Sequence, residues 1–412
     1  MDLLVPEGTR LVHIGPHKTG TTSLQAAFHT RRAALAANRV RYAGRNSQVV
    51  LPVMAVMGRT HMPYGPNPPP MRYWHELVRE VGRATEPRVV ISSEFFSEAS
   101  PADIKRIVDD FDPARVHIVV TLRPLARIVA SQWQQFVQAG TQTSFDDWLV
   151  ALFDHPETGQ ASMFWRRHRH DELIARWAAV VGPSNVTAIA LDDRDHAMVL
   201  RVFEGLTGLP SGTLVTPVDR TNRSLTQAEV EAVRAFNRRA ADETLAKPLL
   251  ARLMRSGAAI YLKEREPAPD EPRIETPHWA LDRAGEVARE MVDRIAASAV
   301  RVVGDLESMA QVPRGSGYTD RPGQTVIPPI VAARTAVGIM LSAGIAAGSR
   351  ATTGSNGSAA ADFAPDVATI PAQPAPAAAL ARVPTRQIGG VIVRRGRVAV
   401  QRRLHRLRPR RG

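Results

Sequence analysis

Short apolar runs alternate with longer segments of helical periodicity from residue 11 to residue 309. The apolar runs predict β-strands over residues 11–14, 39–44, 89–91, 116–122 and 186–191. Between them, apolar residues recur about every three to four positions, which predicts helices over 21–38, 73–83, 101–111, 124–137, 144–153, 163–182, 222–237 and 277–309. Strands that alternate with helices are typical of a parallel sheet flanked by helices. The pattern therefore predicts the α/β fold class.

Polar residues and prolines mark where several elements begin. Ser224 and Gln227 form a capping-box sequence at the start of one helix, and Thr276 followed by Pro277 predicts the start of another. Residues 44–72 contain closely spaced prolines, which predicts a long segment without regular structure. Such a segment is typical of a lid or an acceptor-binding loop, although a surface loop without function fits equally well.

The composition changes after Met309. Residues 311–412 contain 15 Arg, no Lys and 3 Asp, which gives this segment a net charge of +12 out of the +13 of the whole chain. The segment is also rich in Ala, Pro, Gly and Ser and has few patterned apolar residues. The sequence therefore predicts a catalytic domain over 1–310 and a mostly disordered tail over 311–412. The basic tail is expected to make at most weak contacts with anionic membranes or nucleic acid.

The overall composition narrows the class of protein. The 412 residues are 44% hydrophobic and 23% charged, as is typical of a soluble globular protein. The chain has no Cys, which excludes disulfides, thiolate catalysis and Cys-ligated metal sites. The N-terminal residues lack a basic region followed by an apolar core, so no signal peptide is expected. The prediction is a cytoplasmic protein, with membrane association through the tail as an alternative.

The stretch Leu11–Gln25, which reads LVHIGPHKTGTTSLQ, carries the strongest chemical signal. A strand-like run ends at a Gly-Pro pair, and a basic turn leads into a helix at Thr21. The N–H groups from Gly20 to Ser23 are expected at the helix N-terminus, which favours an anion. Lys18 adds a positive charge. The hydroxyl donors of this turn are Thr19, Thr21, Thr22 and Ser23. The stretch predicts a phosphate-binding loop, with a plain strand-turn-helix as the alternative.

The order of residues in this loop differs from that of an NTPase P-loop, where Lys follows the second glycine. Here Lys18 stands between Gly15 and Gly20. The order H-K-T-G-T-T-S-L resembles the 5′-phosphosulfate loop of sulfotransferases that use 3′-phosphoadenosine 5′-phosphosulfate (PAPS). The resemblance implies a P-loop-NTPase-like three-layer sandwich, PAPS as donor and no metal. The donor-site residues that it implies here are Lys18, Thr19, Gly20, Thr21, Thr22 and Ser23.

A second motif follows the strand 116–122. Arg123 stands at the strand end, and Ser131 lies eight residues further along the next helix. An Arg and a Ser so placed resemble the 3′-phosphate site of the same family, which implies that both bind the donor. A planar guanidinium can grip two phosphate oxygens, and a hydroxyl can donate to a third. Taken alone, an Arg-Pro helix start is also explained by capping.

A carboxylate, Glu94, follows the strand 89–91 after two serines. Open α/β sheets bind ligands beyond the carboxyl ends of their strands, so Glu94 is a candidate general base. Glu at this strand end resembles the glycosaminoglycan-type branch of the family, whereas the cytosolic branch uses His. The chain also shows nothing comparable to the Arg-Lys-Gly motif of the cytosolic branch. His13 and His17 are the alternative bases, and a purely structural charge at a helix start is the alternative role for Glu94.

Together, the motifs and the resemblance predict a sulfotransferase that moves a sulfonate group from PAPS to a hydroxyl acceptor. Lys18 is expected to stabilise the leaving phosphate, and Glu94 to take the proton of the hydroxyl. A carbohydrate or glycolipid is the acceptor that the resemblance implies. Two alternatives stay open: a P-loop-type phosphotransferase or kinase, and a non-catalytic nucleotide-binding protein tethered by its basic tail.

The cluster RRHRH at Arg166–His170 invites a metal or phosphate interpretation. Adjacent residues point in different directions around a helix, so they do not converge on one ligand. His168 and His170 also lack a metal-ligand spacing. We expect a solvated basic helix face here.

Overall fold

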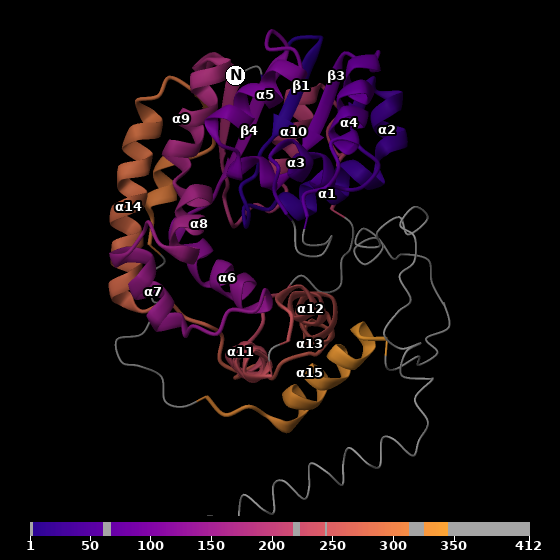
Figure 1. The fold of residues 1–412 in the computed structure, drawn as a ribbon. Helices are drawn as coiled ribbons and strands as arrows, with labels where there is room; N and C mark the ends of the chain where they lie inside the picture. Colours follow the sequence, from indigo (N-terminus) through magenta and orange to yellow (C-terminus); the bar gives the residue numbers. More distant parts are fainter. Residues whose placement is uncertain (1–2, 61–66, 217–222, 244, 313–324, 345–412) are drawn as a thin grey trace, which may run out of the picture. The chain divides into compact units, whose positions relative to one another are not determined.

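One six-stranded sheet organises the computed structural model, which describes residues 3–60, 67–216, 223–243, 245–312 and 325–344 (Figure 1). The strands are β1 (Thr9–His13), β2 (Val40–Tyr42), β3 (Arg88–Ser92), β4 (Val116–Leu122), β5 (Val186–Ala190) and β6 (Arg301–Val303). They lie in the order β2-β3-β1-β4-β5-β6, and every neighbouring pair is parallel. The predicted α/β class with a parallel sheet is confirmed.

Successive side chains of the central strands enter two separate apolar layers. In β1, Leu11 packs on one face of the sheet and Val12 on the other. Parallel sheets are covered on both faces, so their strands need no polar side. The register places Val12 beside Ile91 of β3 and Ile118 of β4, and all three side chains are fully buried. This packing aligns the three central strands, whose carboxyl ends therefore lie along one edge.

Helices cover both faces of the sheet. The layer that contains Leu11 includes α1 (Thr21–Thr30), α2 (Arg32–Ala37) and α10 (Met198–Thr207). The layer that contains Val12 includes α3 (Val50–Val56), α4 (Arg72–Arg83), α5 (Pro101–Asp110) and α9 (His170–Val181). The expected three-layer arrangement of helices, sheet and helices is therefore present.

A third apolar cluster lies outside the two sheet layers. The helices that form it are α6 (Leu125–Gln138), α7 (Phe145–Asp154), α8 (Gly159–His168), α11 (Gln227–Asp242), α12 (Lys247–Leu253), the π-helical turn η4 (Met254–Ala258), α13 (Ala259–Lys263), α14 (His278–Ala296) and α15 (Pro329–Ser342). Its core contains the buried rings of Trp133, Trp148 and Phe164. Figure 1 shows α11, α12, α13 and α15 grouped below α6, apart from the sheet.

Residues 44–72 are not irregular throughout, contrary to the prediction. Residues Val50–Val56 form α3, and Val53 and Met54 are buried in a sheet layer. Pro52 stands in the first turn of α3, where a helix tolerates proline because the N–H groups there have no intrahelical acceptor. Residues 61–66 of the predicted loop lie outside the described residues.

Three predicted helices are shorter than expected. The helices predicted over 21–38, 163–182 and 277–309 stop or break at Arg31, Arg169 and Ala296. The residues after α14 instead form β6 and the 3₁₀ turn η5 (Leu306–Ala310). The strand β6 has only three residues, all half-buried, so it leaves no apolar pattern in the sequence.

The helix starts also differ from prediction. Thr226 and Glu229, not Ser224 and Gln227, form the capping box of α11. The helix α14 begins after Pro277 and has no side-chain cap. Both errors shift a boundary by only one or two residues and leave the layers unchanged.

The segment 325–344, which the sequence places in the disordered tail, contains the helix α15. Val331 is fully buried, and the Arg334 guanidinium donates a hydrogen bond to the carbonyl of Tyr261 at 2.9 Å. This segment is an exception to the expected lack of structure, and residues 313–324 and 345–412 of the predicted tail lie outside the described residues. Among the described helices, none has the length and apolar character needed to cross a membrane.

The helices α15 and η4 pack at a close backbone contact. A Cβ atom at Gly338 would lie 2.8 Å from the carbonyl oxygen of Gly257 and 2.9 Å from the Cα of Ala258. Because backbone atoms cannot rotate away, we expect Gly338→Val to lower the free energy of unfolding by about 1–3 kcal/mol in urea titrations. Ala336→Val, on the exposed face of α15, is the control. Equal losses in both variants would show an effect of helix propensity rather than of this contact.

Candidate functional site

The strand order places a ligand-binding edge at the ends of β3, β1 and β4. From β1 the chain continues to β2 on one side of the sheet, whereas β4, β5 and β6 follow one another on the other side. Open α/β sheets bind ligands at such a switch point, beyond the carboxyl ends of the strands. Lys18 follows β1, Glu94 follows β3 and Arg123 follows β4, so the predicted residues meet at this edge.

The loop after β1 is fixed between β3 and β4. Gly15 has a φ of +77°, and a Cβ atom there would lie 2.9 Å from the Cα of Glu94. The Thr19 side chain is fully buried, and its hydroxyl donates to the carbonyl of Pro16 at 2.7 Å and lies 2.6 Å from Oγ1 of Thr121. The Thr19 hydroxyl therefore holds the loop in place and is engaged within the protein.

The backbone of this loop is strained at Lys18. Its φ of +67° is left-handed, which is uncommon for a residue with a Cβ. Gly20 is also left-handed, with a φ of +75°. Turns that contain left-handed residues can aim several N–H groups into one anion-binding concavity. Backbone strain of this kind clusters at functional sites.

The N-terminus of α1 is open. The helix has no side-chain cap and no acidic residue in its first turn. The N–H groups of its first turn have no intrahelical acceptor, and the helix dipole adds a partial positive charge there. Thr22 is exposed and Ser23 is half-buried, and neither hydroxyl bonds to another described residue. These groups are available to an anionic ligand.

Glu94 is held by two residues of the loop after β1. The Thr21 hydroxyl donates to Oε2 of Glu94 at 2.6 Å, and Nδ1 of His17 lies 3.0 Å from Oε1. The other ring nitrogen of His17, Nε2, lies 3.2 Å from Oε1 of Glu98. Both nitrogens of this buried imidazole face carboxylates, and both can donate only when the ring carries two protons. Glu94, His17 and Glu98 thus form a connected line.

Glu98 sits at the far end of this line and is the more heavily paired carboxylate. It lies 2.8 Å from Nη1 of Arg59 and 2.7 Å from Nη2 of Arg167. Burial raises the pKa of Glu98, but His17 and the two arginines bring it down to about 2. Glu98 is therefore ionised at neutral pH, and it anchors His17 rather than facing a ligand.

The pKa of Glu94 is shifted in the same direction. Burial raises it, but the charge and hydrogen bond of His17, the Thr21 hydroxyl and the charge of Lys18 together lower it to about 2. The carboxylate is therefore ionised at neutral pH and free to accept a proton. It holds that proton weakly until a bound anion offsets the positive charges around it.

Three cations at this edge have no hydrogen bond or ion pair from their side chains to any described residue: Lys18, Arg255 and Lys263. Burial lowers the pKa of Lys18 to about 8, and Lys263 acts in the same direction. Glu94 opposes this shift, whereas Arg123 and Arg255 add to it. Charges that influence one another in this way lie near each other, and an anion among them would relieve their repulsion.

Arg255 and Lys263 are not predicted as site residues from the sequence. They lie on η4 and α13, far along the chain from the loop after β1, in a segment without a known motif. Their positive charges in a largely apolar run are the only sequence signal. Folding alone brings them to Lys18.

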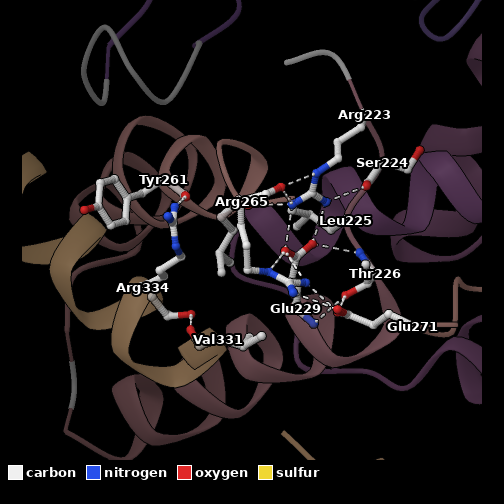
Figure 2. Close-up of polar contacts among 12 residues, drawn as sticks. Arg223, Ser224, Leu225, Thr226, Glu229, Tyr261, Arg265, Glu271, Val331 and Arg334 are labelled. Atoms are coloured by element: carbon white, nitrogen blue, oxygen red, sulfur yellow. Dashed lines mark hydrogen bonds and ion pairs between the residues drawn. The ribbon is translucent and has the colours of Figure 1, made fainter. Parts of the chain in front are cut away.

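A buried ion-pair network holds the segment that carries these two cations (Figure 2). Glu229 is fully buried and accepts hydrogen bonds from Arg223 at 2.7 Å and from Arg265 at 3.0 Å. Arg265 also donates to both carboxylate oxygens of Glu271, at 2.5 and 2.7 Å, and Arg223 donates to the carbonyl of Leu262 at 2.6 Å. The end of α13 is thereby tied to the start of α11. A buried carboxylate is tolerated only with such complete pairing.

Arg123 is already paired. It donates to both carboxylate oxygens of Asp193, at 2.9 and 3.2 Å, and its Nη1 lies 3.5 Å from the carbonyl of Lys18. Ser131 is half-buried, and its hydroxyl donates to the carbonyl of Ile128 at 2.9 Å. Asp193 thus orients the Arg123 guanidinium toward the loop. An anion bound at Arg123 would share this guanidinium with the carboxylate of Asp193.

His13 is fully buried below the loop. Its Nδ1 lies 2.9 Å from Oγ of Ser92, and its Nε2 lies 3.3 Å from Oγ1 of Thr121. Burial lowers the pKa of His13 to about 3, with partial opposition from Glu94. A ring with no exposed atoms cannot reach an acceptor hydroxyl, so His17 is the remaining alternative to Glu94.

The cluster Arg166–His170 is not the solvated basic face that the sequence suggests. His168 and His170 are buried, and Arg167 pairs with Glu98. Burial lowers the pKa of both histidines. Among the described residues, no group of three or more acidic or His side chains is arranged to hold a metal ion.

Comparisons with known proteins give a distant structural likeness. No protein-family model matches the sequence, and no curated protein matches it. Among solved structures, the crystal structure of a sulfotransferase from Alicyclobacillus acidocaldarius matches with 15% sequence identity and a TM-score of 0.43. The match covers 74% of this chain and 99% of the other. We draw no functional conclusion from a likeness at this level, so the proposal below rests on the residues of the site.

Proposed function

We propose that this protein is a sulfotransferase that moves a sulfonate group from PAPS to a hydroxyl acceptor. The observation that carries the proposal is the half-buried Lys18, which has no acidic partner among the described residues and stands at the open N-terminus of α1. An ionised carboxylate, Glu94, lies at the end of the neighbouring strand. A cation and open N–H groups beside a base suit the transfer of an anionic group to a hydroxyl.

The loop fits the phosphate end of such a donor. The N–H groups from Gly20 to Ser23 and the hydroxyls of Thr22 and Ser23 would hold the 5′-phosphate oxygens. The Thr19 and Thr21 hydroxyls bond within the protein, so these residues would act by shaping the loop and aligning Glu94. Arg123 and Ser131 would bind the 3′-phosphate. PAPS supplies an activated sulfonate on a phosphate leaving group, and no metal is needed for this step.

The proposed roles account for every bond and proton in the reaction. The acceptor oxygen attacks sulfur, the bond from sulfur to the bridging oxygen breaks, and its electron pair stays on the 5′-phosphate of 3′-phosphoadenosine 5′-phosphate (PAP). Glu94 takes the hydroxyl proton, and Lys18 offsets the charge that grows on the bridging oxygen. As in phosphoryl transfer, the protein contributes mainly alignment and charge stabilisation.

A carbohydrate or glycolipid hydroxyl is the acceptor class that we propose. The support is the carboxylate at the end of β3, where the carbohydrate-type branch that the sequence resembles has its base. Because His13 is fully buried, we take Glu94 as the base of this proposal and His17 as the alternative.

The donor is tested by calorimetric titration with PAP and with ATP, each with and without Mg²⁺. We expect PAP to bind without metal and at least about tenfold more tightly than ATP, because the 3′-phosphate adds a charged contact. Incubation with PAPS and a panel of hydroxyl acceptors should then release PAP.

Two outcomes would contradict the proposal. Mg²⁺-dependent binding of ATP without binding of PAP would indicate a phosphotransferase. Steeply salt-dependent binding of nucleic acid or anionic vesicles without binding of PAP would indicate a tethered binding protein.

Arg123→Ala is expected to weaken binding of both PAPS and PAP by about tenfold or more, because a bidentate charged contact is lost. The same variant should leave the binding of adenosine 5′-monophosphate nearly unchanged, since that ligand lacks the 3′-phosphate. Arg127→Ala is the matched control, because Arg127 also lies near Asp193, at 3.7 Å, but is half exposed. Equal weakening by both variants would place the 3′-phosphate elsewhere.

A further inference from the structure

Arg255 and Lys263 have no role in the proposed sulfonate transfer. Neither side chain pairs with a carboxylate among the described residues, whereas the nearby Arg167 and Arg223 each do. Both cations lie close enough to Lys18 to act on its charge. Gathering unpaired cations costs stability, so such an arrangement is best explained by an anion that binds there.

The backbone at Arg255 is unusual. Arg255 lies in η4, a π-helical turn between two α-helical segments. Such turns are rare, and they occur frequently at functional sites.

The π turn is anchored on both sides. The backbone of Gly257 packs directly against Gly338 of α15. On the other side, the network of Arg223, Glu229 and Arg265 fixes the end of α13, which carries Lys263 (Figure 2). The two cations are therefore presented from a rigid support, as a preorganised binding site requires.

The surroundings of Arg255 place it toward the reacting end of the site. Arg255 keeps contact with solvent, but the protein atoms around its guanidinium lower its pKa. Arg167 acts in the same direction, and Glu94 opposes it. The Nε of Arg167 is buried and has no hydrogen-bond partner among the described residues, although Nη2 of Arg167 pairs with Glu98. Arg255 thus adds a charge without an ion-pair partner among the described residues beside Arg167 and Glu94.

We propose that Arg255 and Lys263 form a second binding site for an oxyanion: a phosphate, sulfate or carboxylate group. The shared chemistry admits two sources, a second anionic group of the donor or an anionic group on the acceptor. The position near both Lys18 and Glu94 suits either source. The assignment of the anion to donor or acceptor rests on the proposed function, but the presence of the oxyanion site does not.

The site is tested with inorganic sulfate as the probe, titrated into the full chain by calorimetry. Arg255→Ala, Arg255→Gln and Lys263→Ala should each weaken sulfate binding by about tenfold or more. Arg252→Ala is the matched control, since it removes an exposed arginine from the last turn of α12. The control should change sulfate affinity by less than about twofold. Circular dichroism confirms that each variant is folded.

Repeating the titration with PAP-saturated protein separates the two sources. If PAP abolishes sulfate binding and Arg255→Ala weakens PAP, the anion belongs to the donor. If sulfate still binds beside PAP and Arg255→Ala abolishes that binding, the anion belongs to the acceptor. Either result supports the site.

The proposal is overturned if Arg255→Ala and Lys263→Ala leave the affinities for sulfate and PAP unchanged, or if Arg252→Ala lowers them equally. The second result would indicate an adventitious ion only. A wild-type protein that does not bind PAP would overturn the proposed function instead, and the sulfate titration would still decide the oxyanion site.

Discussion

Replacing Lys18 by alanine is expected to lower turnover by about 10²- to 10³-fold while weakening PAP binding much less. The reason is that the ammonium group matters most when the bridging oxygen gains charge, which happens in the transition state and not in the bound donor. Turnover is measured from the release of PAP, and affinity from calorimetric titration. Arg123→Ala should show the opposite balance, with a larger loss of affinity than of turnover.

The matched variant Lys18→Met keeps most of the side-chain length and removes the charge. It should lose as much turnover as Lys18→Ala, because both variants lack the ammonium charge. Both also keep a residue with a Cβ on the left-handed backbone of the loop, so the loop is equally affected. Recovery of turnover in Lys18→Met would show that volume, not charge, is what the site needs. If Lys18→Ala and Arg123→Ala affect binding alone and to the same extent, the division of roles is wrong.

The charge of Lys18 also predicts a pH dependence. Its pKa is lowered to about 8, so the free protein loses this positive charge as the pH rises through about 8. Because kcat/KM reports the free protein, it should fall on the alkaline side of that value. Lys263→Ala removes a positive charge that lowers the pKa of Lys18, so the fall should move to higher pH. If the pH profile of Lys263→Ala matches that of the wild type, Lys263 does not act on the charge of Lys18.

The sheet is the part of the fold that the sequence predicts best. Strands such as 116–122 are mostly apolar because parallel strands are buried on both faces, and this signal is local. The strand β6 is not predicted, because its three residues lie at the sheet edge and are only half-buried. The helix α3 is missed because it is short, contains Pro52 and is followed by closely spaced prolines in the sequence, although five of its seven residues are buried.

The candidate site is predictable where it depends on strand ends. Lys18, Glu94 and Arg123 each follow a predicted strand, and parallel strands bring such positions to one edge. What the sequence cannot give is the pairing of side chains across that edge. The sequence suggests that the Thr19 and Thr21 hydroxyls are free to bind a ligand. In the structure, Thr19 bonds to Thr121 and Thr21 donates to Glu94.

The positions of Arg255 and Lys263 near Lys18 could not be predicted from the sequence. Their approach to Lys18 depends on how α11 to α15 pack against one another, and on a network whose members are spread from Arg223 to Glu271. The helical pattern of a single segment contains no information about such contacts. The same holds for Asp193, which follows β5 and meets Arg123 only because β4 and β5 are neighbours.

Glu94→Gln is expected to lower turnover by about two to four orders of magnitude and to leave PAP affinity close to wild type. The amide keeps the size of the side chain and can still accept the hydrogen bond from Thr21, but it cannot take a proton from the acceptor. Turnover is measured by PAP release and affinity by calorimetry. Glu98→Gln is the matched control, because Glu98 also contacts His17 but is enclosed by Arg59 and Arg167. It should lower thermal stability more than Glu94→Gln does, and turnover much less.

The pH profile of the wild type gives a second test of the same residue. The free carboxylate has a pKa of about 2, because His17, Thr21 and Lys18 outweigh burial, so kcat/KM should show no acidic limb from Glu94 at pH 5 or above. A bound anionic donor offsets the charge of Lys18, which raises the pKa of Glu94 in the complex. The acidic limb of kcat should therefore lie at higher pH than that of kcat/KM, and it should be lost in Glu94→Gln. A variant that keeps its turnover within a few-fold and retains the limb would transfer the role of base to His17, whose Nδ1 lies 3.0 Å from Oε1 of Glu94.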